Sequence, residues 1–209
     1  MLTISVIAQK GGSGKTTLAR SLAVACELDG KSAAVVDLDP QASAALWSKR
    51  RGEEPPEVIS TVLPLLGDIL KQAAEMVDVV ILDTPPKSSE AAIAAAQAAD
   101  LIIIPCRPQV DDIETLPGTK QILAVAGSAP TFVVLNAVSP IQARNEEAAS
   151  AIAEHPTAPF DVCPQTLGNR AAFGDASVLG QTPQEYDPRG KAALEIQNVY
   201  KYAMEQVSQ

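Results

Sequence analysis

The chain has 209 residues and a formal net charge of −9; hydrophobic residues make up 46% of it and aromatic residues only 3%. This length fits one domain with a sizeable core, and the acidic balance argues against a surface broadly coated with nucleic acid. No apolar run approaches the roughly 18–20 residues needed to cross a bilayer, and the N-terminus lacks a signal-peptide pattern. Three well-separated cysteines, Cys26, Cys106 and Cys163, predict reduced thiols in a cytosolic protein, not a disulfide framework or a zinc site.

Short apolar runs alternate with helical patterns along the chain. We expect strands at 2–8, 33–36, 58–62, 77–82, 101–104 and 131–135, with a further short one near 160–163. We expect helices at 18–28, 42–51, 63–76, 89–98, 111–126, 144–154, 169–179 and 191–207. Pro117 either kinks the helix at 111–126 or marks its true start. The alternation predicts an α/β fold over 1–209 as a single domain, with a mostly parallel twisted sheet and helices on both faces.

A glycine-rich loop separates the first strand from the first helix. Strand, glycine loop and helix in that order form a phosphate cradle, because glycines turn backbone N–H groups inward and the helix start adds about half a positive charge. Lys15 can reach the β- and γ-phosphates, and the Thr16 hydroxyl can hold Mg²⁺. The alternative is a Gly/Ser turn with two surface lysines, in which each glycine would cost about 0.5–1 kcal/mol for no benefit. The expected nucleotide-binding residues of this loop are Lys10, Gly11, Gly12, Ser13, Gly14, Lys15, Thr16 and Thr17.

Aspartates follow two of the apolar strands. Asp83 comes directly after a buried run, where a carboxylate is costly unless a cation such as Mg²⁺ lies near; a turn or helix-capping aspartate is the alternative. Asp37 and Asp39 share a face, and their charges repel unless a metal or water separates them, so Asp37 is expected to support the metal shell. No histidine is near these motifs, so hydrolysis would depend on positioning and charge neutralisation.

Asn136 follows the strand at 131–135. Its amide can both donate and accept toward a base edge, although a turn asparagine is the alternative. The guanine-reading pattern Asn-Lys-x-Asp is missing, which favours ATP over GTP. Because ligands of open α/β sheets bind at the carboxyl ends of the strands, we expect the functional residues to meet at one edge. These are the phosphate loop, Asp37, Asp39, Asp83, Pro105 and Asn136.

Lys10 at the head of the loop gives the pattern KGGxGK[ST], which resembles the deviant Walker A motif of the ParA/MinD ATPases. The resemblance implies that Lys10 reaches across an ATP-bound homodimer to the nucleotide of the other subunit. The stretch Val-Asp-Leu-Asp-Pro-Gln is similar to switch I of that family, which implies that Asp39 positions the attacking water. Thr84-Pro85-Pro86 is similar to switch II, and Asn136 would contact adenine. The resemblance thus implies catalytic residues Lys10, Lys15 and Asp39, and a Mg²⁺ site formed by Thr16, Asp39 and Asp83.

The resemblance extends to most of the chain, including Pro105-Cys106-Arg107-Pro108, which is similar to a segment near the dimer face, and the tail at 180–188. Because the chain starts directly at the first strand, it is similar to small ParA proteins without an N-terminal helix-turn-helix domain. The implied protein is a cytoplasmic, nucleoid-associated ATPase for plasmid or chromosome partition, with slow intrinsic turnover. Its ATP dimer would bind DNA without sequence preference, and a ParB-like centromere-binding or cargo adaptor protein would stimulate hydrolysis.

The distribution of charge complicates the DNA-binding role, because the last fifty residues hold more acidic than basic side chains. The candidate DNA contacts there are Arg170, Arg189, Lys191 and Lys201. The run Lys49-Arg50-Arg51 is another candidate, although such runs commonly form a solvated helix end. Alternatives are a ParA-like ATPase that positions a chemoreceptor cluster or microcompartment, a MinD-like membrane ATPase, a nitrogenase-iron-protein-type reductase, which needs paired cysteines, and a ligase-like enzyme on the same fold.

Overall fold

The computed structural model describes residues 1–207, which form one parallel sheet flanked by helices. The strand order is β3-β2-β4-β1-β5-β6-β7, and β8 pairs with the end of β6. Every pairing is parallel, so all the carboxyl ends lie at one edge. The strands are β1 (Leu2–Val6), β2 (Ala33–Asp37), β3 (Glu57–Ser60), β4 (Val79–Asp83), β5 (Leu101–Cys106), β6 (Thr131–Val138), β7 (Asp161–Val162) and β8 (Leu167–Gly168). The predicted α/β fold is confirmed.

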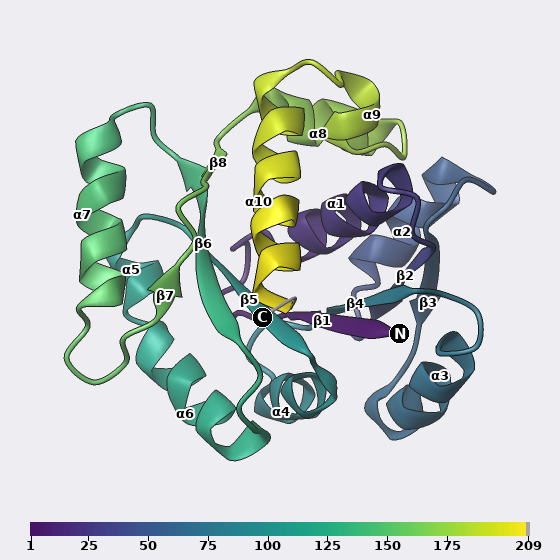
Figure 1. Cartoon of the computed structure of the whole chain (residues 1–209), viewed down its shortest axis with the longest axis horizontal. Helices are drawn as coiled ribbons and strands as arrows, with labels where there is room; N and C mark the ends of the chain where they lie inside the picture. Colours follow the sequence, from purple (N-terminus) through teal and green to yellow (C-terminus); the bar gives the residue numbers. More distant parts are fainter. Residues whose placement is uncertain (208–209) are drawn as a thin grey trace.

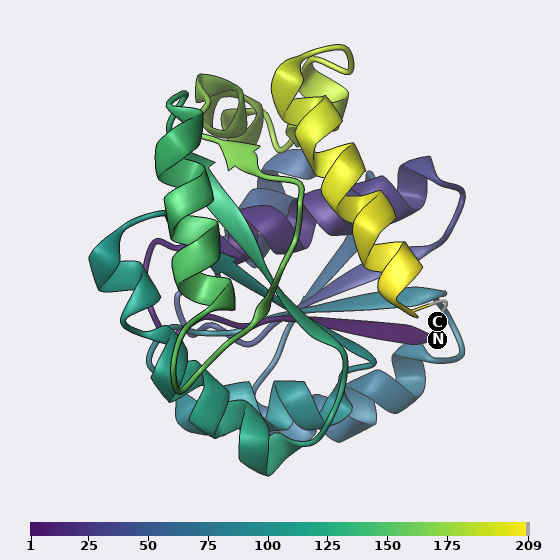
Figure 2. The ribbon, with the colours of Figure 1, turned by 60° about the vertical axis from the view of Figure 1, so that its left-hand side comes forward.

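Helices cover both faces of this sheet, with α1, α2 and α10 on one side and α3, α4 and α6 on the other (Figures 1 and 2). The helices are α1 (Lys15–Leu28), α2 (Ser43–Arg51), α3 (Leu66–Ala73), α4 (Ser89–Ala98), α5 (Val110–Ile113), α6 (Leu116–Ala126), α7 (Gln142–Ala153), α8 (Ala171–Val178), α9 (Pro183–Tyr186) and α10 (Lys191–Val207). A short 3₁₀ turn, η1 (Leu63–Leu65), precedes α3. None of these helices is long and apolar enough to span a membrane.

The core consists of two aliphatic layers, one on each face of the sheet. In β4, Val79 and Ile81 pack with α1 and α10, whereas Val80 and Leu82 pack with the helices of the other face. Successive side chains of a strand point to opposite faces, so a strand covered on both sides is apolar throughout. This arrangement explains the near-continuous apolar runs, and it holds the strand ends rigidly in place.

Several predicted bounds differ from the structure; the helix expected at 63–76, for example, is η1 followed by α3, which ends at Ala73. Two further differences have a clear physical reason. The helix expected at 111–126 is two helices, α5 and α6, and Pro117 lies in the first turn of α6. A proline is tolerated there because its missing N–H would have no partner within the helix. The strand expected to end at Leu135 continues to Val138, because β8 pairs with Asn136 and Val138. The two-residue β8 carries too little pattern to be predicted.

Candidate nucleotide site

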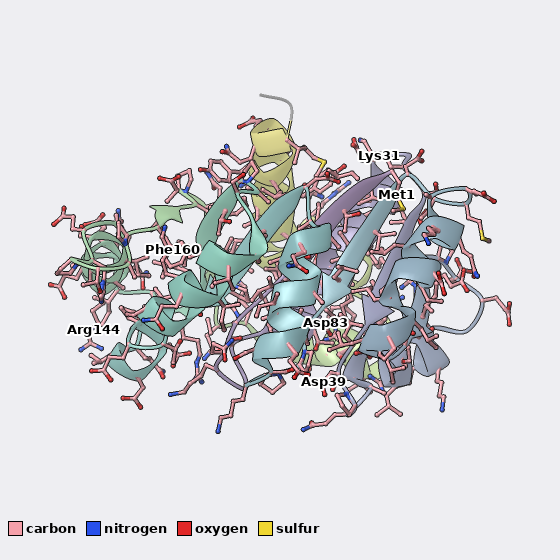
Figure 3. The ribbon with its side chains drawn as sticks, turned by 90° about the horizontal axis from the view of Figure 1, so that it is seen from below. Met1, Lys31, Asp39, Asp83, Arg144 and Phe160 are labelled. Atoms are coloured by element: carbon pink, nitrogen blue, oxygen red, sulfur yellow. The ribbon has the colours of Figure 1, made fainter. Side chains whose placement is uncertain are left out.

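The carboxyl ends of the central strands bring the expected residues to one edge of the sheet. Asp83 of β4 lies beside Val6 of β1 on one side and beside Asp37 of β2 on the other. Figure 3 shows Asp39 and Asp83 at this edge, whereas Met1 and Lys31 lie at the opposite edge. The phosphate loop leaves β1 at this same edge and leads into α1, so it lies next to the two aspartates.

The loop at 9–14 has the conformation that an anion cradle needs. Gly14 has φ 96°, and a Cβ added there would lie 2.1 Å from Nδ2 of Asn136, so only glycine fits without displacing Asn136. The α1 N-terminus that follows has no side-chain cap. Ser13 Oγ is buried and makes no hydrogen bond among the described residues. Free donors at a helix start and an unpaired buried hydroxyl fit a bound phosphate group.

Lys15 is buried at the base of the loop, with 6% of its surface exposed. Its Nζ donates to the carbonyl oxygen of Lys10 at 3.2 Å. Burial lowers the pKa of this amine, while the charges of Asp83 and Asp39 oppose the shift. The ammonium group therefore lies in the field of the two carboxylates, where a triphosphate would give it a much stronger partner.

Asp83 is fully buried, and neither carboxylate oxygen accepts a hydrogen bond of normal geometry from the described residues. Burial is the main reason that its pKa rises to about 7; the nearby Thr16 hydroxyl acts in the opposite direction. An unpaired carboxylate at this position fits a cation. No group of three or more His, Cys, Asp or Glu could hold a metal within residues 1–207. Mg²⁺ at Thr16 and Asp83 would therefore need phosphate oxygens to complete its shell, as is usual for this ion.

The raised pKa of Asp83 predicts a pH-dependent stability in the absence of Mg²⁺. Because the folded-state pKa of about 7 lies above the usual 3.8, the native chain retains a proton that the unfolded chain loses, and the free energy of unfolding should fall between about pH 4 and pH 7. We expect Asp83→Asn to raise the melting temperature at pH 8 without Mg²⁺ by several degrees, since roughly 1 kcal/mol moves it by about 2–4 °C. At pH 4, near the unfolded-state pKa, the difference should be small; an equal gain at pH 8 and pH 4 would contradict a buried charge.

Asp37 has a structural role in addition to the support of a metal shell that was expected of it. Its side chain is buried; Oδ1 accepts a hydrogen bond from the Asp39 N–H at 3.0 Å, and Oδ2 accepts from the N–H groups of Ala44 and Ala45 at 3.0 and 3.2 Å. Asp37 thus caps the start of α2 from the end of β2 and fixes the backbone of Asp39. Three backbone donors already bind this carboxylate, and its support of the metal shell stays a prediction.

Asp39 itself is partly exposed, and its Oδ1 accepts a hydrogen bond from the Gln41 N–H at 2.9 Å. It lies near enough to Lys15 for its charge to act on that amine. The carboxylate faces a hollow of about 480 Å³ between the loops that follow β2, β3 and β4. Asp39 is therefore accessible to water at the edge where the phosphate loop opens.

Lys10 has different surroundings from Lys15. Its Nζ lies 3.4 Å from the carbonyl oxygen of Asp111 and 3.9 and 4.0 Å from the carboxylates of Asp111 and Asp112. Asp112 is buried and is held by Arg107, whose Nε and Nη2 donate to it at 2.9 and 3.0 Å. Sequence reasoning missed both acids, although an adjacent acidic pair follows the Pro105–Pro108 segment.

Asn136 contacts the phosphate loop. Its Nδ2 donates to the carbonyl oxygen of Ser13 at 2.7 Å, and its Oδ1 accepts from the N–H of Ala137 at 2.8 Å. Ala137 adopts a positive φ of 52°, which lets β6 bend at this point. The Asn136 amide therefore stabilises the loop through its hydrogen bond to Ser13, and its contact with adenine stays a prediction.

The candidate DNA contacts do not form one patch. Arg170 is held in an ion pair with Glu195, and its Nε donates to that carboxylate at 2.9 Å. Lys191 lines the same hollow of about 350 Å³ as Arg170, together with Asp187. Lys201 lies on α10 about 15 Å from Lys191, by the rise of an α-helix. Arg189, Lys191 and Lys201 are exposed, and their side chains make no hydrogen bond or ion pair within residues 1–207.

The parallel sheet, the glycine loop and the aspartates at the strand ends define a P-loop nucleotide-binding protein. Residues 4–172 match the CobQ/CobB/MinD/ParA nucleotide binding domain, and the chain belongs to this family. It is similar to the maintenance of carboxysome distribution protein A of Gloeobacter kilaueensis, with 30% identity over 209 residues that cover 98% of this chain and 93% of the relative.

Two further relatives extend the comparison. The chromosome-partitioning ATPase Soj of Thermus thermophilus is 30% identical over 145 residues, which cover 55% of this chain and 58% of Soj. Among solved structures, a substituted McdA of Cyanothece in complex with ATP has a TM-score of 0.77 and 17% identity, and the match covers 100% of this chain and 96% of that one. At this identity the structural likeness supports the fold alone.

Proposed function

We propose that residues 1–209 act as one ParA-type ATPase domain that dimerises with ATP and positions a cargo. The observation that carries the proposal is the contrast between the two lysines of one loop. Lys15 is buried at the base of the loop, whereas the Lys10 side chain is 33% exposed and turned toward Asp111 and Asp112. Lys15 would bind the triphosphate of its own chain, which leaves Lys10 to reach a triphosphate held by a second copy.

The ligands we propose for this site are ATP and Mg²⁺. ATP would supply the phosphoanhydride whose cleavage resets the switch, and Mg²⁺ would neutralise charge on the phosphates. Loop residues Gly11 to Thr17 would bind the phosphates, Thr16 and Asp83 would hold the ion, with Asp39 beside them, and Asn136 would contact adenine. Asp39 would orient the attacking water. Because no strong general base adjoins Asp39, turnover by one dimer should be slow until a partner raises it.

For the cargo, we propose DNA partition: a cytoplasmic, nucleoid-associated dimer that binds DNA without sequence preference and is stimulated by a ParB-like centromere-binding protein. A second candidate is the positioning of a protein cargo through an adaptor. It is supported by the nearly full-length likeness to a carboxysome distribution protein. A membrane-bound role has less support, because α10 carries Lys191 and Lys201 against Glu195 and Glu205 and so has no basic face.

ATP-dependent binding to random-sequence duplex DNA tests the DNA part of the proposal. We expect the double variant Arg189→Ala/Lys191→Ala to weaken this binding about tenfold and to reduce the log–log salt slope by roughly 0.9 for each phosphate that is no longer neutralised. Lys71→Ala removes a lysine of α3, on the other face of the sheet, that is no candidate DNA contact, and it is the control, with little expected effect. If the wild type dimerises with ATP but binds no DNA at low salt, DNA partition is excluded and the protein-cargo candidate stands.

A further inference from the structure

One exposed apolar surface lies where the end of α8 packs on α2; we call Leu46, Arg50, Val178 and Leu179 the α2–α8 surface. Figure 1 shows both helices on the same face of the sheet. Arg50 joins them, because its Nε donates to the Ser177 carbonyl and its Nη1 to the Leu46 carbonyl, each at 3.0 Å. Leu46, Val178 and Leu179 are 51%, 72% and 56% exposed. Three large apolar side chains thus flank one guanidinium group on the outside of the molecule.

Positive charge collects beneath and beside this surface. Arg20, only 9% exposed, lies with its guanidinium carbon 5.6 Å from the centre of the Trp47 ring, and it makes no hydrogen bond or ion pair among the described residues. Arg51 approaches the same ring at 5.0 Å, but it is paired with Glu185. Burial, and then the charge of Arg50, lower the pKa of Arg20 to about 10. Among the described residues, only Arg51 of these three arginines forms an ion pair, although the charge of Asp83 also acts on Arg20 and the chain as a whole carries −9.

We propose that the α2–α8 surface docks an amphipathic segment of a partner protein in which acidic side chains flank apolar ones. The apolar side chains would cover Leu46 and Leu179, and a carboxylate would pair with the guanidinium of Arg50, which donates to two backbone carbonyls but to no carboxylate among the described residues. A guanidinium forms a stronger, charge-assisted hydrogen bond with a carboxylate than with a neutral carbonyl, so the exposed Arg50 favours an acidic partner. Duplex DNA fits less well, because exposed leucine and valine offer nothing to phosphates, and Glu53 and Glu54 follow α2 directly.

This surface connects to the nucleotide site through α2. The start of α2 is held by Asp37, which also binds the backbone N–H of Asp39. A segment that shifts α2 would therefore shift the carboxylate proposed to orient water. This step rests on the proposed function, and it identifies the α2–α8 surface as the place where an adaptor would raise hydrolysis.

A displayed library of sixteen-residue helical peptides, screened against the full-length chain with MgATP, tests the docking proposal. We expect the enriched peptides to combine Asp or Glu with Leu, Ile or Phe at helical spacing. Binding can be followed by the fluorescence of Trp47, the only tryptophan of the chain. Arg50→Glu and, separately, Leu179→Ser should each weaken binding roughly tenfold or more. Val125→Ser, at a 67% exposed valine of α6, is the control and should bind normally.

The possible outcomes are distinct. Peptides that bind Arg50→Glu and Leu179→Ser as well as they bind the wild type would overturn the proposal, as would a screen that enriches no acidic, apolar sequence. Loss of DNA binding in Arg50→Glu, with peptide binding retained, would assign the surface to nucleic acid instead. ATP turnover is measured on the same samples. If the wild type binds the peptides but never hydrolyses ATP, the proposed function is refuted, whereas the docking proposal still holds.

Discussion

Lys15→Ala is expected to abolish nucleotide binding, with the affinity for MgATP falling by about a hundredfold or more. The ammonium of Lys15 lies buried at the base of the loop, in the field of Asp83 and Asp39. Without it, the phosphates lose a charge-assisted hydrogen bond worth roughly 1.5–3 kcal/mol and lie unscreened near two carboxylates. Titration of the chain with a fluorescent ATP analogue measures the change directly.

Lys71→Ala is the matched control for Lys15→Ala, because Lys71 is an exposed lysine of α3 whose ion pair with Asp68 lies at the surface. It should bind ATP normally. Circular dichroism should show that Lys15→Ala retains its helices, since the packed layers on both faces of the sheet do not depend on this residue. A Lys15→Ala variant that binds MgATP within a few-fold of the wild type would show that the loop does not form the phosphate site.

Lys10→Ala should separate binding from dimerisation. ATP affinity should stay within a few-fold of the wild type, because Lys10 points toward Asp111 and Asp112 rather than into its own loop. The ATP-dependent dimer should disappear, and hydrolysis should fall by about a hundredfold, the usual effect of removing one charged donor from a transition state. Single-turnover kinetics measures the rate of hydrolysis, and sedimentation of the same sample measures the fraction of dimer.

Asp111→Asn provides a comparison for Lys10→Ala, because it removes one of the acids beside Lys10 and keeps the lysine. Lys10 must leave Asp111 and Asp112 to reach a second subunit, so this variant should dimerise at lower ATP concentration than the wild type. Weaker dimerisation in Asp111→Asn would mean that Asp111 contributes to the dimer contact, and that it does not compete with the second subunit for Lys10. Normal dimerisation of Lys10→Ala would contradict the role proposed for the lysine.

The sequence predicted the fold, and it predicted that the candidate site residues meet at the strand ends, because both depend on local pattern. Apolar runs covered on both faces gave the parallel sheet, and the glycine spacing located the loop whose Gly14 admits no side chain. The roles that depend on contacts between distant segments could not be read in this way. The approach of Asp111 and Asp112 to Lys10 joins residues about a hundred positions apart. The cap that Asp37 places on α2 requires the strand end and the helix start to be seen together.

The proposed switch requires two copies of this chain to close around ATP. Sedimentation equilibrium of Asp39→Ala with saturating MgATP tests this most directly, because a chain that cannot orient the attacking water should hold the closed state. The prediction is a particle of twice the chain mass of 21.8 kDa, returning to a single chain when ADP replaces ATP. A particle that stays at 21.8 kDa under these conditions would contradict the account.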